Sequence, residues 1–178
     1  CSFTVTVVDN EDPTITCPTN ISQNVDAGLC SASVAVPNAT IGDNCGVTVL
    51  TWTMTGATVA SSPATGINQI GTYTFSTGVT TVEYTVTDAA GNDATCSFTV
   101  TVVDNEDPTI TCPVDVTINC DDDSTPVGTG TATAIDNCAV VDDITITFTD
   151  ISTQSIDPLL PGYYNYTITR TWRATDPS

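Results

Sequence analysis

The sequence predicts an all-β protein made of tandem immunoglobulin-like β-sandwich domains. The segment CSFTVTVVDNEDPTITCP occurs at residues 1–18 and recurs letter for letter at 96–113, so the second copy begins 95 residues after the first. One sandwich of the immunoglobulin type has about 100 residues, which matches that spacing. Hydrophobic residues alternate with threonine and other polar residues at period two, and no stretch has the period of an amphipathic helix.

The complete repeat spans residues 11–103 and contains six predicted strands, separated by turns rich in glycine and asparagine. In chain order they are Thr14–Val25 (interrupted at Pro18), Cys30–Val36, Val47–Thr55, Thr72–Ser76, Thr81–Thr87 and Thr95–Val103. In each strand, β-branched or aromatic residues at alternate positions place one side chain in two toward a core. Three of these strands have clear predicted core faces. They are Leu50, Trp52 and Met54 in Val47–Thr55; Val82, Tyr84 and Val86 in Thr81–Thr87; and Phe98, Val100 and Val102 in Thr95–Val103.

Two incomplete repeats flank the complete one. Residues 1–10 are predicted to be the last strand of a preceding repeat plus a linker. Residues 104–178 are predicted to be a second, diverged sandwich that lacks its last strand. We therefore expect the sequence to be an excerpt of a longer tandem chain.

Charge and composition exclude several classes of function. The chain has 2 Lys+Arg against 21 Asp+Glu, and its formal net charge of -19 excludes nucleic acid as a partner. No apolar run reaches the roughly 18 residues of a membrane span, so we expect no membrane insertion. The absence of histidine and lysine removes histidine triads, Schiff-base chemistry and P-loops, so we expect no enzyme activity and no catalytic residues. Eight cysteines without a CxxC pair favour disulfides, and so predict an extracellular location, secreted or on the cell surface.

The complete repeat also carries short motifs at defined positions. They are Ile15–Pro18 (ITCP), Gly28–Cys30 (GLC), Asp43–Gly46 (DNCG), Thr80–Asn92 (TTVEYTVTDAAGN) and Ala94–Phe98 (ATCSF). In these motifs the chain resembles the hyalin-repeat (HYR) family over nearly the whole repeat. The second repeat keeps ITCP, DNC and ATD but has its second cysteine at Cys120 and Pro177 in place of Ala89. The resemblance implies an immunoglobulin-like fold found in extracellular adhesive or matrix proteins, without catalytic activity.

Acidic residues are predicted to meet at one end of each sandwich. Successive strands alternate in direction, so the incoming linker, the loop before Val47 and the loop after Thr87 converge. Carboxylates held about 5 Å apart at an effective dielectric near 20 repel by roughly 3 kcal/mol per pair, so a cation is expected, and all-oxygen ligands favour Ca²⁺. The predicted ligands are Asp9, Asn10, Glu11, Asp12, Asp43 and Asp88 for the first junction, and Asp104, Asn105, Glu106, Asp107, Asp136 and Asp176 for the second. The alternative is that these are ordinary turn and linker residues in solvent.

The same topology predicts the disulfides of the complete repeat. Cys45 and Cys96 are expected at the same end of the sandwich and therefore to pair, which leaves Cys17 for Cys30 by elimination.

The pairing of Cys1, Cys112, Cys120 and Cys138 stays open. Cys112 with Cys120 would be the counterpart of Cys17 with Cys30, but eight residues of straight strand span about 26 Å, so a kink at Pro113 would be required.

We expect a non-enzymatic structural and adhesive module that forms a rod or fibre, stiffened by Ca²⁺ and clamped by disulfides. Its partners are neighbouring repeats of the same protein. Filaments by strand addition are a further hypothesis, in which residues 1–8 complete the second sandwich of another molecule and Cys1 bonds Cys138; a continuous tandem chain is the alternative. The alternative function is a carbohydrate- or protein-binding module, for example for surface glycans, with specificity in residues 55–72 or 150–164.

Overall fold

The computed structural model describes residues 1–177, which form two compact units. The first comprises Cys1–Asn105, and the second begins at Glu106. Within the described residues, no helix is both long and apolar enough to cross a membrane. The fold is all-β apart from three single-turn helices in the second unit, which confirms the predicted class.

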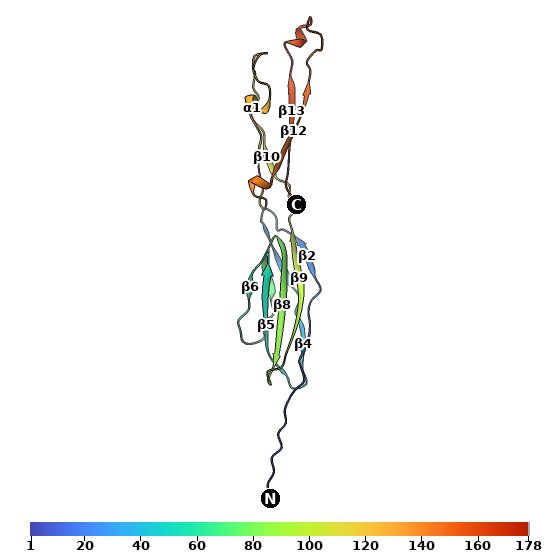
Figure 1. The fold of residues 1–178 in the computed structure, drawn as a ribbon, viewed down its shortest axis with the longest axis vertical. Coiled ribbons are helices and arrows are strands. Elements are labelled where there is room, and N and C mark those ends of the chain that lie inside the picture. Colours follow the sequence, from blue (N-terminus) through green and yellow to red (C-terminus); the bar gives the residue numbers. More distant parts are fainter. Residues whose placement is uncertain (178) are drawn as a thin grey trace. The chain divides into compact units, whose positions relative to one another are not determined.

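The first unit is built from three groups of paired strands (Figure 1). Its largest sheet has five strands in the order β2-β9-β8-β5-β6, with bounds β2 Ile21–Asn24, β9 Asp93–Val103, β8 Gly78–Asp88, β5 Val47–Gly56 and β6 Ala60–Ser61. Two antiparallel pairs accompany it, β3 (Ser31–Val36) with β7 (Gly71–Ser76) and β1 (Thr14–Thr16) with β4 (Thr40–Gly42).

The core lies between the five-stranded sheet and the β3–β7 pair. Side chains at alternate positions of β5, β8 and β9 are buried, as their period-two pattern predicts, although Trp52 is only half-buried. Trp52 on β5 meets Tyr73 on β7 edge to face at 6.0 Å between ring centroids. The hydroxyl of the fully buried Tyr84 accepts a hydrogen bond from the backbone N–H of Ile70, just before β7. These contacts join the two layers.

At Pro18, where the sequence predicted an interruption, the chain passes from one sheet to another. Before it, β1 pairs with β4; after it, β2 pairs in parallel with β9, with Ile21 opposite Val100. Cys17 lies at this crossover, next to β9. The period-two pattern located both halves of the segment but contains no information on which sheet each half joins.

The disulfide of the first unit is Cys17–Cys96, with 5.8 Å between the Cα atoms, so both predicted pairings are wrong. Cys96 was expected at the end of the sandwich beside Cys45. Instead β9 begins at Asp93, two residues before its predicted start and three before Cys96, which places Cys96 about 10 Å along the strand, opposite Tyr84. The crossover brings Cys17 to that level, while Cys45 stays in the exposed end loop.

The second unit has fewer strand pairs. β10 (Thr109–Thr111) pairs with β11 (Thr133–Ile135), and β12 (Thr145–Ser152) pairs with β13 (Ile168–Thr175). The short helices are α1 (Pro126–Thr129), η1 (Val141–Asp143) and η2 (Pro161–Tyr163). Cys112 and Cys120 are exposed thiols, so the pairing of these two cysteines, which the sequence left open, does not occur in this structure.

Arg170, on β13, joins separate segments of the second unit through polar contacts. It forms a bidentate ion pair with Asp150 at 2.8 Å for both bonds, and it also donates to the hydroxyl of Thr129 and the backbone carbonyl of Ser124. Its guanidinium carbon lies 4.8 Å from the ring centroid of Phe148. Among the described residues of this unit, the only buried hydrophobic residues are Ala132, Ala134 and Ile144.

Candidate metal centre

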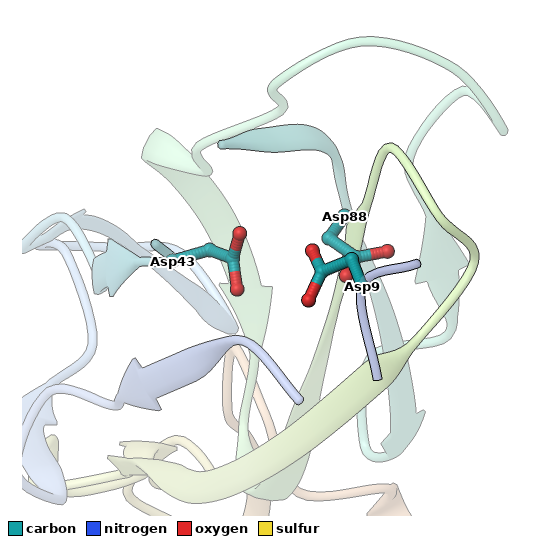
Figure 2. Close-up of side chains that lie close together, drawn as sticks. All are labelled: Asp9, Asp43 and Asp88. Carbon is teal, nitrogen blue, oxygen red and sulfur yellow. The ribbon is translucent and has the colours of Figure 1, made fainter. Parts of the chain in front are cut away.

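Three carboxylates converge at one end of the first unit. Asp9 lies in the segment before β1, Asp43 directly follows β4, and Asp88 ends β8. Each offers one carboxylate oxygen, and these oxygens all lie within 4.8 Å of one another. Figure 2 shows the carboxylates of Asp9 and Asp43 directed toward each other, with Asp88 beside Asp9.

Asp43 is held by the turn that follows it. Its Oδ2 accepts hydrogen bonds from the backbone N–H groups of Cys45 at 2.7 Å and Gly46 at 2.8 Å. Gly46 has φ of +105°, a conformation that favours glycine and lets the chain close this turn. The other oxygen, Oδ1, is buried and accepts no hydrogen bond.

Asp9 presents a second oxygen of this kind. Its Oδ1 accepts from the backbone N–H of Glu11 at 3.2 Å, while its Oδ2 is buried and accepts no hydrogen bond. A buried carboxylate oxygen without a donor is costly, because desolvation of a charged group is not offset. Two such oxygens on neighbouring carboxylates are therefore suited to accept a cation.

Asp88 is 3% exposed and accepts several hydrogen bonds. Its Oδ1 accepts from the backbone N–H of Gly91 at 2.6 Å and of Asn92 at 2.8 Å, and its Oδ2 accepts from the Asn92 side-chain amide at 2.8 Å. Burial alone would raise the pKa of Asp88, but the hydrogen bonds from Asn92 and Gly91 outweigh it and hold the pKa below its ordinary value. Asp88 therefore contributes a negative charge.

Two amides attach the linker to the sandwich. The Asn44 side chain donates to Oε2 of Glu11 at 2.7 Å, and the Asn92 side chain donates to the Glu11 backbone carbonyl at 3.2 Å. Glu11 thus borders the centre, whereas Asn10 and Asp12, also predicted as ligands, are exposed and outside the group of three carboxylates.

Cys45 also belongs to this site, which sequence reasoning missed because it assigned Cys45 to a disulfide. A hydrogen bond with Asp9, together with the charges of Asp9, Asp43 and Asp88, raises the pKa of the Cys45 thiol. The adjacent DNCG turn was the available signal, since it places Cys45 two residues after a site carboxylate.

The second unit repeats this arrangement with its own residues. Oδ1 of Asp136 accepts from the backbone N–H of Cys138 at 2.7 Å and of Ala139 at 2.6 Å, and its Oδ2 is buried without a hydrogen bond. The hydrogen bond from Ala139, the largest influence, lowers the pKa of Asp136.

The remaining predicted ligands of the second junction are distributed as follows. Carboxylate oxygens of Asp136 and Asp176 lie within 4.8 Å of each other, and Asn137 donates to Oε2 of Glu106 at 2.8 Å, as Asn44 does to Glu11. Asp107 is exposed. Asp104 and Asn105 are the last two residues of the first unit, directly after β9.

The donor set of the first centre fits calcium. Ca²⁺ binds oxygen ligands at about 2.3–2.6 Å, so two of its ligands can lie up to about 5 Å apart, and the three carboxylates satisfy this. Asp9 Oδ2 and Asp43 Oδ1 have lone pairs available for such a cation.

Comparisons with known proteins agree on one family. The family model of the HYR domain matches residues 8–102. Hyalin of Strongylocentrotus purpuratus is 36% identical over 152 residues, which cover 80% of this chain and 11% of that protein. Hyalin of Lytechinus variegatus is 36% identical over 122 residues, or 65% of this chain and 20% of that protein.

The name of a third relative lists other types of domain. The sushi, von Willebrand factor type A, EGF and pentraxin domain-containing protein 1 of Rattus norvegicus is 34% identical over 102 residues, or 57% of this chain and 2% of that protein. The chain thus spans a fifth or less of the length of these relatives.

Proposed function

The chain belongs to the HYR domain family, and on that premise we propose that it is a non-enzymatic, extracellular adhesive module whose acidic centre binds Ca²⁺ and thereby stiffens the linker that precedes each sandwich. The observation that carries this proposal is the pair of buried oxygens, Asp9 Oδ2 and Asp43 Oδ1, that accept no hydrogen bond.

The charge balance of the first unit supports a mobile cation as the missing partner. Residues 1–105 contain neither lysine nor arginine, since the only two basic side chains are Arg170 and Arg173. No side chain of this unit can therefore neutralise Asp9, Asp43 and Asp88. A divalent cation would supply that charge from solution.

The donors favour Ca²⁺ over Mg²⁺. Ca²⁺ accepts six to eight oxygen ligands in irregular geometry, whereas Mg²⁺ requires a near-ideal octahedron at about 2.0–2.1 Å and retains most of its water. Carboxylates from three separate segments form an irregular set of this kind. Water and backbone carbonyls would complete the coordination.

Stiffening follows from where the ligands lie in the chain. Asp9 belongs to the linker, while Asp43 and Asp88 are attached to β4 and β8 of the sandwich. A cation shared by these carboxylates would restrict the backbone of residues 9–12. It would add to the hydrogen bonds that attach Glu11 to Asn44 and Asn92 of the sandwich.

Calcium titration of matched variants tests the proposal. We expect Ca²⁺ to raise the thermal unfolding midpoint of the first unit, by about 10 to 20 °C at one hundred times the dissociation constant. Asp43→Asn should remove most of this shift, and Asp12→Asn, an exposed acid of the same linker, should retain it. Isothermal titration calorimetry measures the binding directly. A midpoint that is the same in Ca²⁺ and in EGTA, or an Asp43→Asn variant that responds like the unmodified chain, would contradict calcium binding.

A further inference from the structure

Strand β7 of the first unit is paired along one edge only. Among the described residues, β3 is the only strand that pairs with it. The N–H of Thr77 donates to the backbone carbonyl of the residue before β3, whereas the N–H of Ser76 points the other way and donates to the side-chain hydroxyl of Thr58 at 2.9 Å. Successive residues of a strand direct their N–H and C=O groups to opposite edges, so the exposed Thr72 and Thr74 direct theirs away from β3, as Ser76 does.

The other edges of this sandwich are covered or short. On the outer edge of β3, Oδ2 of Asp26 accepts from the N–H of Ser33 at 2.9 Å, and the side chain of Gln23 donates to the Ser33 carbonyl at 3.3 Å. Residues 60–68 cover the edge of β5 through hydrogen bonds and through β6. Strands β1, β2, β4 and β6 have two to four residues each. Natural sheets protect their edges in these ways, but on β7 the bond to Thr58 covers only the last of six residues.

The open edge lies in an uncharged part of a strongly acidic chain. Residues 44–82 contain no Asp, Glu, Lys or Arg, although the formal net charge of the chain is -19, and β3 is uncharged as well. A basic partner would therefore find no carboxylate on β7 to bind. A second copy of this chain can approach along β7 without the like-charge repulsion that its acidic end loops impose. The distribution of charge thus favours a second copy as the partner of this edge.

Partly exposed aromatic side chains accompany the open edge. Tyr73 on β7 contacts Trp52 on β5 at 6.0 Å and Phe75 at 5.6 Å between ring centroids. Phe75 is fully buried, whereas Trp52 and Tyr73 are only half-buried. Val59, which follows Thr58, is 79% exposed. A strand added beside β7 would cover part of this apolar surface.

We propose that the β7 edges of two copies of this chain pair antiparallel about a two-fold axis at Tyr73, so that their β3–β7 pairs join into one continuous sheet. In this register Thr72 of each copy lies opposite Thr74 of the other, and each such pair exchanges two backbone hydrogen bonds. The two Tyr73 residues form the non-hydrogen-bonded pair between them, with Cα atoms about 4.5 Å apart. The N–H groups of Ile70 and Ser76 already donate to the Tyr84 and Thr58 hydroxyls, which limits the pairing to the residues between them.

This inference names a partner for the adhesive module and does not rest on calcium binding, because β7 contains no residue of the acidic centre. Association is therefore measured in EGTA, where the outcome is independent of whether the centre binds Ca²⁺. The free thiols are alkylated beforehand, so that disulfides between copies cannot form while Cys17–Cys96 stays intact.

The first experiment is analytical ultracentrifugation of the 178-residue chain over a range of concentrations. We expect a reversible dimer whose association strengthens with added NaCl, because salt screens the repulsion between two acidic chains. A chain that stays monomeric at millimolar concentration, or association that weakens with salt, would overturn the proposal.

A proline variant identifies the edge that pairs. Thr74→Pro should weaken association at least about tenfold, because it removes an N–H from each of the two hydrogen-bonded pairs. An edge position whose N–H faces solvent tolerates proline in the monomer. Thr74→Val keeps this N–H and is the matched control, which should associate like the unmodified chain. Association that Thr74→Pro leaves unchanged would show that another surface pairs.

The second experiment tests the register and needs no proline variant. The side chains of Thr72 and Thr74 are exposed, so charges at these positions leave the core intact. Thr72→Asp/Thr74→Asp places like charges opposite each other in both pairs and should abolish association, whereas Thr72→Asp/Thr74→Lys places opposite charges there and should retain it. Thr4→Asp/Thr6→Asp adds the same negative charge in an exposed segment outside the strands and should also retain association. Equal association of the two variants at positions 72 and 74 would refute this pairing.

Discussion

Removal of the Cys17–Cys96 disulfide should destabilise the first unit by a predictable amount. The two cysteines are 79 residues apart. In the chain-entropy model, a loop of that length removes entropy from the unfolded chain worth about 4.5 kcal/mol at 25 °C. Stability of a domain of this size is about 5–15 kcal/mol, so the loss is large enough to measure and small enough to leave a folded protein.

Urea denaturation of alanine variants measures this loss. A Trp172→Phe background makes the half-buried Trp52 the only tryptophan, so its fluorescence reports on the first unit alone. With a denaturant slope of roughly 2 kcal/mol/M, Cys17→Ala, Cys96→Ala and the double variant should each lower the midpoint by about 2 M, because each breaks the same bond.

The control variant is Cys45→Ala, which removes an exposed thiol and should cost under about 0.5 kcal/mol. A loss from Cys45→Ala equal to that from Cys96→Ala would refute the observed pairing and restore the one predicted from the sequence. A double variant twice as destabilised as either single variant would show that the two residues act separately.

Two further predictions concern backbone conformation and pH. Gly56→Ala should lower the free energy of unfolding by more than about 2 kcal/mol in urea, because φ is +99° and a methyl group would collide with the Val79 carbonyl; Gly66→Ala, at φ +81° with open space around it, should cost about 1 kcal/mol. The hydrogen bond from Arg170 lowers the pKa of Asp150, so this pair stabilises the second unit above the ordinary pKa of about 3.9 and loses its effect as pH falls through the lower folded-state value. The difference in thermal midpoint between the unmodified chain and Asp150→Asn should therefore shrink between pH 6 and pH 2, and an unchanged difference would exclude the ion pair as its cause.

The strands of the first unit were largely predictable because alternation at period two persists over long segments. The 10 residues of β5 and the 11 each of β8 and β9 give this pattern room to appear. The 3 residues of β4 and 2 residues of β6 are too short to show it. Alternation in the sequence identifies a strand and its buried face, but not the strand with which it pairs. It therefore could not predict that the chain changes sheet between β1 and β2.

The same distinction explains the outcome at the candidate site. Sequence topology led to Asp9, Asp43 and Asp88, because strand direction alone determines which loops share an end. The disulfide depends instead on how far along β9 a residue lies, and β9 begins two residues before its predicted start, which shifts the position of a side chain along the strand by about 7 Å. Cys45 was misassigned for that reason.

The exact repeat combines two structural roles in one segment. Residues 96–103 belong to β9 of the first unit, and residues 109–111 form β10 of the second, so the repeated segment ends one sandwich and begins the next. In residues 1–18, Val8 is bonded directly to Asp9, and Cys1 and Cys17 lie on either side of this junction.

A cation at the first centre would be coupled to the order of the linker through Asp9, because Asp9 lies before β1 whereas Asp43 and Asp88 are attached to β4 and β8. Any contact that ordered the residues before Asp9 would reduce its conformational freedom before a cation binds, so less entropy would be lost on binding. Thermodynamic reciprocity then requires that calcium strengthen such a contact by the same factor by which the contact strengthens calcium binding.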